Sequence, residues 1–368
     1  MVSNIRCVLG IAVLTAGCSR ADHGAPADSP VAVPLSWQID PRWAVGGTGD
    51  SLLQLGTTYA DDIGADSAAH LWIIDRTESR VVEYDTDGNR FRALGRQGLG
   101  PGEFEYPASM EFTRTGDVRV YDIRKRAIVV FAADGTPRPE EAPHPRMRQS
   151  TTLANGDLVA LRYAPDTSIL RTLTNGEVRA LVTFAAPGQR PIPDACSVIG
   201  QTAAPVFSPT LAYAVRGNRV VYSTGDYALT IYEPGKPDRI LRRAATRLPT
   251  TVEMARLHLG LGMPIQIVGR PVCYIPTDMV ISAAGVASTL PAYSRLVVAP
   301  DSRIWALRFT VGNEARFADI YDPDDGYQGT VLLGTLNPTT FLSDGSLVSL
   351  ESDDDDVPVI VVYRVEVP

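Results

Sequence analysis

Short runs of apolar and β-branched residues, separated by tight-turn signatures, extend along most of the chain. The first complete set reads "DDIGAD", "LWIID", "RVVEYDT" and "RFRALG", where apolar and polar positions alternate as in half-buried strands. Asp87 and Gly88 separate the last two runs, and both residue types accept the backbone geometry of a hairpin turn. The pattern predicts a unit of four antiparallel strands.

Two kinds of turn signature repeat with this unit. Inner turns, between the first and second strands, are predicted at Asp66-Ser67, Gly116-Asp117, Asn155-Gly156, Gly217-Asn218, Asp301-Ser302 and Asp344-Gly345. Outer turns, between the third and fourth strands, are predicted at Asp87-Gly88, Asp134-Gly135, Asn175-Gly176, Pro234-Gly235 and Asp325-Gly326. Six inner turns against five outer turns predict six units, the last of which lacks its fourth strand.

The missing strand indicates how the chain closes. An unpaired sheet edge favours aggregation, and the segment "PLSWQID" precedes the first unit without a partner of its own. We predict that this N-terminal segment pairs with the C-terminal strands and closes a ring. The predicted fold class is therefore all-β, a six-bladed β-propeller with ring closure by the N-terminal strand.

A four-stranded meander places its connections on two faces. The turns between strands one and two and between strands three and four lie on one side, the short-turn face. The loops between strands two and three and the connections between blades lie on the other side, the looped face. The looped face is predicted to carry the segments 95–107, 186–209 and 245–291 and the acidic run "SDDDDVP". Because insertions concentrate at binding surfaces, it is the predicted functional surface.

The segment 245–291 is predicted to be a small helical insert between blades 4 and 5. In "TTVEMARLHLGLG", Thr250 and Glu253 form a capping box, and Met254, Leu257 and Leu261 share one helical face. The helix either covers the core between blades 4 and 5 or forms a lid over the mouth of the central channel.

The segment "GRQGLGPGEFEYP", Gly95 to Pro107, raises the question of a phosphate-binding loop. A dinucleotide fingerprint must follow a buried parallel strand and open a helix, and a P-loop ends in Gly-Lys-Ser or Gly-Lys-Thr. Neither context is present, so the glycines are predicted to permit a tight path from blade 1 to blade 2. With the following "GDVRVYD" and "RAIVVFAADG", the segment resembles six-bladed β-propellers of the NHL-repeat-like and TolB-like kind, many of which are bacterial lipoproteins. The resemblance implies the propeller fold and export from the cytoplasm, and it does not imply one particular activity.

The N-terminus reads as an export signal. Arg6 precedes an apolar run from Val8 to Leu14 that is too short to span a bilayer, and small residues then lead to Cys18. The end of this stretch, "LTAGC", resembles the bacterial lipobox, which implies cleavage before Cys18 and attachment of diglyceride and palmitate chains. The expected organisation is a lipoprotein signal peptide over 1–17, a flexible tether over 18–33 and the propeller over 34–368. The expected location is the bacterial cell envelope, lipid-anchored and facing the periplasm or the cell exterior.

The composition is that of a globular protein with no general attraction for nucleic acid. Of the 368 residues, 45% are hydrophobic and 21% are charged, and the formal net charge is -8. An acidic protein is not drawn to phosphate backbones. We expect a monomer that is attached to a membrane through lipid on Cys18 and has an unidentified protein or glycan partner.

Candidate catalytic chemistry is sparse. The four histidines are His23, His70, His144 and His258, and none has ligand spacing to another. The run from Asp353 to Asp356 lacks the glycine and the distal glutamate of an EF-hand loop, so a solvated loop is expected there. No Gly-x-Ser-x-Gly motif is present. We therefore assign no catalytic residue, no metal ligand and no cofactor.

Two cysteines remain once Cys7 is removed with the signal peptide and Cys18 is lipidated. Cys196 and Cys273 lie in long connections on the looped face, in a protein whose export would allow disulfides to persist. We predict a disulfide between them, with two buried free thiols as the alternative.

Two classes of function remain. The first is binding or scaffolding through the looped face, with basic residues around the channel mouth as the candidate surface: Arg76, Arg80, Arg96, Arg124 and Arg126. In the alternative interpretation, these arginines form rim salt bridges with Asp75, Glu78, Glu103 and Asp122. The second class is a metal-dependent hydrolase or lyase in the central channel, for which the inner strands offer Asp61, Asp62, Asp66 and Glu111.

Overall fold

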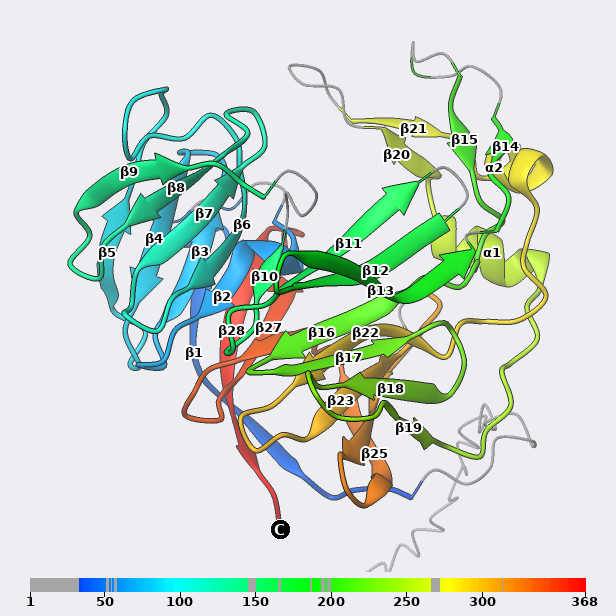
Figure 1. Ribbon diagram of the computed structural model, residues 1–368. Helices are drawn as coiled ribbons and strands as arrows, with labels where there is room; N and C mark the ends of the chain where they lie inside the picture. Colours follow the sequence, from blue (N-terminus) through cyan, green and yellow to red (C-terminus); the bar gives the residue numbers. More distant parts are fainter. Residues whose placement is uncertain are drawn as a thin grey trace, which may run out of the picture.

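The computed structural model describes residues 33–50, 53, 55, 58–144, 150–164, 167–185, 187–192, 196, 200–265, 272–312 and 314–368. Six four-stranded antiparallel sheets follow one another along these residues and form the blades of a β-propeller (Figure 1). The predicted six-bladed β-propeller is confirmed.

The strands of each blade are given from the propeller axis outward. Blade 1 contains β2 (Ile63–Ala65), β3 (Leu71–Asp75), β4 (Arg80–Tyr84) and β5 (Arg90–Leu94), and blade 2 contains β6 (Pro107–Phe112), β7 (Val118–Asp122), β8 (Ala127–Phe131) and β9 (Pro137–Glu141). Blade 3 contains β10 (Thr151–Thr152), β11 (Leu158–Ala164), β12 (Thr167–Thr174) and β13 (Glu177–Ala185), and blade 4 contains β16 (Ala212–Arg216), β17 (Arg219–Ser223), β18 (Ala228–Tyr232) and β19 (Arg239–Arg242). Blade 5 contains β22 (Tyr293–Val298), β23 (Ile304–Arg308), β24 (Arg316–Asp322) and β25 (Gly326–Gly334), and blade 6 contains β26 (Pro338–Phe341), β27 (Leu347–Ser352), β28 (Pro358–Glu366) and β1 (Gln38–Gly46). A short 3-10 helix, η1 (Ala60–Asp62), precedes β2.

β1 supplies the fourth strand of blade 6 by pairing with β28. The pairing is antiparallel, with Gly46 opposite Val359. β1 begins later than the predicted "PLSWQID" segment and extends past it. The reason is that the preceding residues bond to blade 5, where the amide of Leu35 donates to the carbonyl of Thr330 in β25 at 2.9 Å. The N-terminal segment therefore contacts both of the last two blades.

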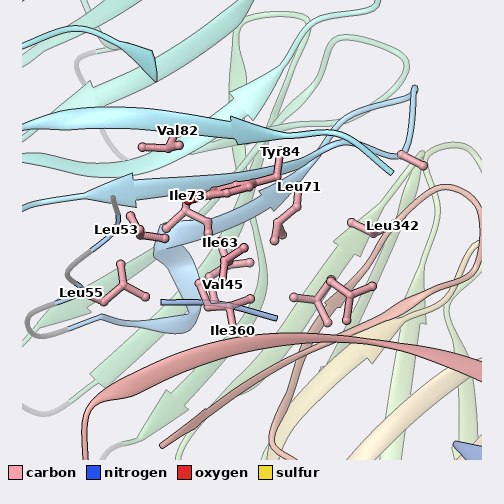
Figure 2. Packing of buried hydrophobic residues seen from close by; sticks show 13 residues of the cluster. Val45, Leu53, Leu55, Ile63, Leu71, Ile73, Val82, Tyr84, Leu342 and Ile360 are labelled. Atoms are coloured by element: carbon pink, nitrogen blue, oxygen red, sulfur yellow. The ribbon is translucent and has the colours of Figure 1, made fainter. Parts of the chain in front are cut away.

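Apolar side chains pack between neighbouring blades. Figure 2 shows the cluster between blades 6 and 1, which includes Ile73, Val82 and Ile360, each with 0% of its surface exposed. Burying a side chain of this size stabilises the fold by about 1.5–3 kcal/mol. Similar clusters lie between blades 1 and 2, 3 and 4, 4 and 5, and 5 and 6. Within the described residues, no such cluster lies between blades 2 and 3.

Two connections form a small insert beside blades 4 and 5. It contains the paired strands β14 (Arg190–Pro191) and β15 (Thr202–Ala203), the paired strands β20 (Met263–Ile265) and β21 (Cys273–Ile275), and the helices α1 (Val252–Leu259) and α2 (Thr277–Ala284). Figure 1 shows these elements together beyond the ends of β11 and β13. Their apolar cluster includes Phe207, Ala255 and Val280 and reaches Val311 of blade 5. The insert therefore covers the ends of blades, and its described residues do not line the central cavity.

α1 differs from the predicted helix in its cap and in its apolar face. Its N-cap is Thr251 and not the predicted Thr250. The predicted face was wrong at two positions, because Leu257 is 61% exposed and Leu261, 77% exposed, lies beyond the end of the helix. The helix packs instead through Ala255, which is 0% exposed. Neither α1 nor α2, nor any other helix within the described ranges, has the length and apolarity needed to cross a membrane.

A disulfide joins the two parts of the insert. The Cα atoms of Cys196 and Cys273 are 5.6 Å apart, and the bond links positions separated by 77 residues in the sequence. The structure thus contains the disulfide and not the pair of free thiols. The connection that follows β14 is tied to the start of β21.

The acidic run at 353–356 lies between β27 and β28 and holds the N-terminal segment. The carboxylate of Asp353 accepts hydrogen bonds from the amide of Thr48 at 2.7 Å, from the Thr48 hydroxyl at 2.8 Å and from the amide of Val357 at 2.9 Å. These bonds, led by the one from the Thr48 amide, lower the pKa of Asp353 from 3.8 to about 2.

This lowered pKa predicts a pH dependence. Because the folded pKa lies below the unfolded value, the carboxylate stabilises the fold above about pH 4, and this contribution is lost as the pH falls toward 2. An NMR titration of the Asp353 carboxyl carbon is expected to show a midpoint near 2. In Thr48→Val, which keeps the amide and removes the hydroxyl, the midpoint is expected to rise but to stay below 3.8. A wild-type midpoint near 3.8 would contradict this account.

Candidate functional site

A cavity of about 640 Å³ lies at the centre of the propeller. Every innermost strand contributes to its wall, for example through Ile63, Met110, Thr151, Ala214, Leu296 and Thr340. The cavity extends past the innermost strand of blade 2, where its lining includes Tyr121 on β7 and Ile128 on β8. Blades 2 and 3 are the pair of blades without an apolar cluster among the described residues. The volume lies in the range of small-molecule binding sites.

Two arginines add positive charge to the cavity wall. Arg216, the last residue of β16, donates hydrogen bonds to the carbonyls of Val298 at 3.3 Å and Phe341 at 3.4 Å. Arg295 in β22 donates to the carbonyl of Pro338 at 3.1 Å. Val298 and Phe341 end their inner strands, whereas Pro338 begins β26. Arg216 therefore lies at the short-turn end of the cavity, and Arg295 lies nearer the looped end.

The charges of two further residues of the wall, Arg119 and Glu111, offset each other. Arg119 forms an ion pair with Glu111, whose carboxylate also accepts from the amide of Thr152 at 2.9 Å. Arg216 forms no ion pair with a carboxylate of any described residue. Burial lowers the pKa of Arg216, while the charge of Asp301 acts in the opposite direction. Among the described residues of the wall, three arginines therefore accompany one carboxylate, in a protein whose formal net charge is -8.

The rest of the wall is rich in hydroxyl groups and aromatic rings. These side chains are Ser109, Ser150, Thr151, Ser294, Thr339, Thr340, Tyr59, Tyr121, Tyr163 and Tyr213. Serine and threonine hydroxyls both donate and accept hydrogen bonds, and tyrosine offers an apolar face with a polar tip. Such a wall suits a ligand that carries many hydroxyl groups.

Aromatic rings and guanidinium groups alternate at the looped end of the cavity. The Cζ of Arg76 lies 4.9 Å from the ring centre of Tyr59 and 5.3 Å from that of Tyr106. The Cζ of Arg124 lies 5.5 Å from the same Tyr106 ring. Tyr59 is 51% exposed and lines the cavity. We name Tyr59, Arg76, Tyr106 and Arg124 the mouth row, because it begins at the cavity mouth and extends over blades 1 and 2.

The buried carboxylate of Asp122 orients this row. It accepts from the amides of Glu105 at 2.7 Å and Tyr106 at 2.9 Å, and from the amides of Arg124 at 3.0 Å and Lys125 at 2.9 Å. Asp122 ends β7 and has 0% of its surface exposed. The loop that carries Arg124 is therefore fixed to the connection that carries Tyr106.

Most residues of the predicted basic cluster have carboxylate partners. The pairs are Arg76 with Asp62, Arg80 with Asp75 and Arg96 with Glu103, with N to O distances of 2.6, 2.9 and 2.8 Å. Asp62 was not among the predicted partners, and Glu78 and Asp122 form none of these pairs. Arg124 and Arg126 form no ion pair with the residues that the structure describes. Arg96 is largely exposed, and exposed pairs stabilise a fold by about 0–1 kcal/mol, whereas the carboxylates of Asp62 and Asp75 are buried.

The glycine-rich segment is a packed turn. The amide of Phe104 donates to the carbonyl of Arg96 at 2.8 Å, and the amide of Gly98 donates to the carbonyl of Phe104 at 2.9 Å. Gly95 has a φ of +84°, and a Cβ there would overlap the ring of Phe104, which is 0% exposed. The glycines of this segment serve backbone geometry and packing, and Leu99 at its tip is 72% exposed.

The carboxylates considered for a channel metal site are held apart. Asp62 is buried against Arg76, and Glu111 is paired within the cavity wall. Asp66 lies between β2 and β3 on the short-turn face. The side chain of Asp61 lies outside the part of the chain that the structure describes.

A separate group of Asp66, His70 and Glu83 has the geometry of three possible metal ligands. The Nδ1 of His70 lies 2.6 Å from a carboxylate oxygen of Glu83 and 3.6 Å from one of Asp66. Glu83 also pairs with Arg92, and Asp66 accepts from the indole of Trp72 at 3.0 Å. A guanidinium beside the group disfavours a cation, so these residues form a polar network within blade 1. Spacing along the sequence did not predict this group, because Glu83 lies 13 residues after His70. The antiparallel pairing of β3 with β4, which places Glu83 opposite Trp72, brings the two side chains together.

Sequence analysis also missed Arg216 and Arg295. The available signal was one arginine within the expected inner strand "YSRLVVA" and another directly after the expected inner strand "TLAYAV". An inner strand alternates side chains between its two faces. The strand pattern did not identify the residues that line the channel.

No protein-family model matches the sequence, and no curated protein matches it. Among solved structures, the chain is similar to a DUF4221 family member from Bacteroides vulgatus, at 9% identity and a TM-score of 0.49, over 92% of this chain and 98% of that chain. It is also similar to a Bacteroides fragilis protein described as exported, at 13% identity and a TM-score of 0.48, over 90% of this chain and 95% of that chain. A third is regucalcin, a calcium-binding protein from Agrobacterium tumefaciens, at 10% identity and a TM-score of 0.42, over 90% of this chain and 95% of that chain.

Likenesses at this level carry no argument about activity, and the chain's own sheets identify its fold. Six four-stranded blades surround one central cavity, and the N-terminal strand completes the last blade. The chain is therefore a six-bladed β-propeller, the fold of the NHL-repeat-like family that its glycine-rich segment resembles.

Proposed function

We propose that this chain is an extracytoplasmic binding protein whose ligand enters the central cavity from the looped face. The observation that carries the proposal is the cavity itself, about 640 Å³ in volume and lined by hydroxyl groups, tyrosine rings and three arginines, of which Arg119 is paired with Glu111. A concave site with a few convergent polar groups is typical of small-molecule or segment binding. The ligand is a glycan or a peptide, or an exposed part of a partner protein.

The looped face supports this direction of entry. The mouth row begins at the cavity and offers stacking surfaces on blades 1 and 2. Large apolar side chains are exposed on the same face, at Leu99, Ile123, Tyr163 and Tyr274. Exposed aromatic and apolar groups beside a cavity favour ligand contact.

The proposed location rests on the N-terminal sequence. The export signal and the lipobox at Cys18 support a propeller that is tethered to a membrane of the cell envelope. Residues 1–32 lie outside the described ranges. The disulfide between Cys196 and Cys273 supports an oxidising compartment. The alternative of a metal-dependent hydrolase or lyase gains no specific support from the described carboxylates, and we do not propose it.

Filling the cavity is expected to abolish ligand binding. Ser294→Trp places an indole in the cavity from β22, because Ser294 is exposed there. Arrays of envelope glycans and peptides would be probed with the wild-type protein and with this variant. We expect the array members that the wild type retains to bind Ser294→Trp at least about tenfold more weakly, a loss of about 1.4 kcal/mol.

Ser343→Trp is the matched control, because it places the same side chain between β26 and β27 on the short-turn face. It is expected to bind like the wild type, and circular dichroism would check that both variants fold. Unchanged binding by Ser294→Trp, or a loss confined to Ser343→Trp, would show that the cavity is not the site.

A further inference from the structure

We infer that the cavity binds an acidic oligosaccharide, with Arg216 and Arg295 each receiving a carboxylate of the ligand. This inference rests on the proposed function and adds the chemical class of its ligand. The two arginines supply the charge, and the hydroxyl-rich wall supplies the contacts to the sugar rings.

The two arginines are placed one behind the other along the channel. Arg216 contacts the carbonyls of residues 298 and 341, and Arg295 contacts the carbonyl of residue 338. Arg295 is three residues before 298 on β22, and 338 is three residues before 341 on β26. At about 3.3 Å per residue, both strands place the two guanidinium groups roughly 10 Å apart along the axis. A ligand with several carboxylates along its length can reach both.

The guanidinium of Arg216 has capacity for an anion. Its hydrogen bonds to the described residues come from Nη1 alone, at 3.3 and 3.4 Å, and both go to neutral carbonyls. A carboxylate can accept two parallel hydrogen bonds from a guanidinium, and this charged geometry is about twice as strong as a neutral bond. An incoming carboxylate would also offset the cost of burying this cation.

The wall favours a sugar over a peptide. Ser109 and Thr340 present hydroxyls that can both donate and accept, which matches the hydroxyl groups of a sugar ring. The hydroxyls of Ser294 and Thr339 donate to the carbonyls of Leu307 and Val348, and their oxygens can still accept from a sugar. Tyr213 and other tyrosines of the wall offer ring faces for the apolar faces of sugars. A peptide with acidic side chains carries the charge but few hydroxyls, so it uses only part of this wall.

The test is isothermal titration of the full-length protein with three probes of similar length: trigalacturonate, neutral maltotriose and triglutamate. We expect trigalacturonate to bind, and maltotriose and triglutamate to bind at least about tenfold more weakly. Arg216→Gln and Arg295→Gln are each expected to lower the affinity for trigalacturonate by roughly 10- to 100-fold. Arg242→Gln, an exposed arginine on β19 outside the cavity, is expected to leave it unchanged.

Two measurements keep the test decisive if Arg216→Gln folds poorly. Arg216→Lys keeps the charge without the planar donor geometry, so we expect it to bind trigalacturonate with an intermediate affinity. The wild-type affinity is also expected to fall as ionic strength rises, because the contacts are ionic.

The outcomes separate this inference from the proposed function. Equal binding of trigalacturonate and maltotriose, or unchanged binding by both arginine variants, would overturn the acidic ligand while the Ser294→Trp array experiment still tests the cavity. Stronger binding of triglutamate would make the ligand an acidic peptide and overturn the sugar. Failure of the wild type to bind any of the three probes would overturn the inference, and the proposed function would stand or fall on the array alone.

Discussion

Replacing Asp319 with alanine is expected to lower the free energy of unfolding by about 3–5 kcal/mol. Asp319 lies on β24 with 0% of its surface exposed. Its carboxylate pairs with Arg243 and with Arg308, each at 2.7 Å. Arg243 follows β19 of blade 4, so this one carboxylate ties blade 4 to blade 5. Removing it leaves two cations without their shared partner in a site with little water.

Neutral donors complete the network around Asp319. The hydroxyl of Tyr293 donates to it at 3.0 Å and the hydroxyl of Thr330 donates at 2.7 Å. The hydroxyl of Tyr321 lies 2.6 Å from that of Tyr293. Burial raises the pKa of Tyr293, and both tyrosines remain protonated donors at neutral pH. Two arginines and two hydroxyls thus bond directly to the carboxylate of Asp319, which is the shared acceptor of this network.

Urea unfolding of Asp319→Ala and of Asp324→Ala would measure this effect. Asp324 is the matched control, because it forms an ion pair of similar length, 2.7 Å to Arg239, with 84% of its side chain exposed. We expect Asp324→Ala to cost less than about 1 kcal/mol. A loss in Asp319→Ala no larger than that in the control would contradict the role of the buried network.

Removing the disulfide is expected to be the second large effect. The double variant Cys196→Ser with Cys273→Ser is expected to lose about 4 kcal/mol, because the bond closes a loop of 77 residues and restricts the unfolded chain. The loss of stability is expected to be largest in the insert, whose apolar cluster links α1, α2 and both short hairpins. Hydrogen exchange is expected to accelerate at the amides of α1 and α2 more than at those of β3 or β23.

Single variants provide the control for the disulfide. Cys196→Ser and Cys273→Ser each break the same bond, so each alone is expected to cost as much as the double variant. Effects that add together would show that the two side chains act through separate packing contacts. An unchanged midpoint of unfolding would show that the bond does not restrict the unfolded state.

Local sequence rules were sufficient for the architecture. Glycine at Gly88, Gly135 and Gly345 adopts φ values of +84°, +87° and +90°, as the predicted hairpin turns require. The count of such turns predicted both the number of blades and the missing strand, because turn geometry and strand alternation act over only a few residues. The same logic assigned each connection to the looped or the short-turn face.

Local rules were not sufficient for the pairing of charged side chains. Arg76 was predicted on a binding surface or in a rim salt bridge, and it lies between two tyrosine rings and pairs with the buried Asp62. Asp62 was read as a candidate channel ligand. The partner of an arginine depends on which strand end ring closure brings beside it, and neighbouring positions in the sequence do not encode this.

Turn residues and two-residue alternation are properties of short segments, so an all-β chain of six four-stranded units with long connections on one face could be predicted before any contact was known. The content of the central cavity could not be predicted in this way. Closing the ring brings Arg216 and Arg295, which lie on different blades, into one cavity, and it leaves blades 2 and 3 without an apolar cluster among the described residues. These features depend on contacts between blades, whose energies come from side chains far apart in the sequence.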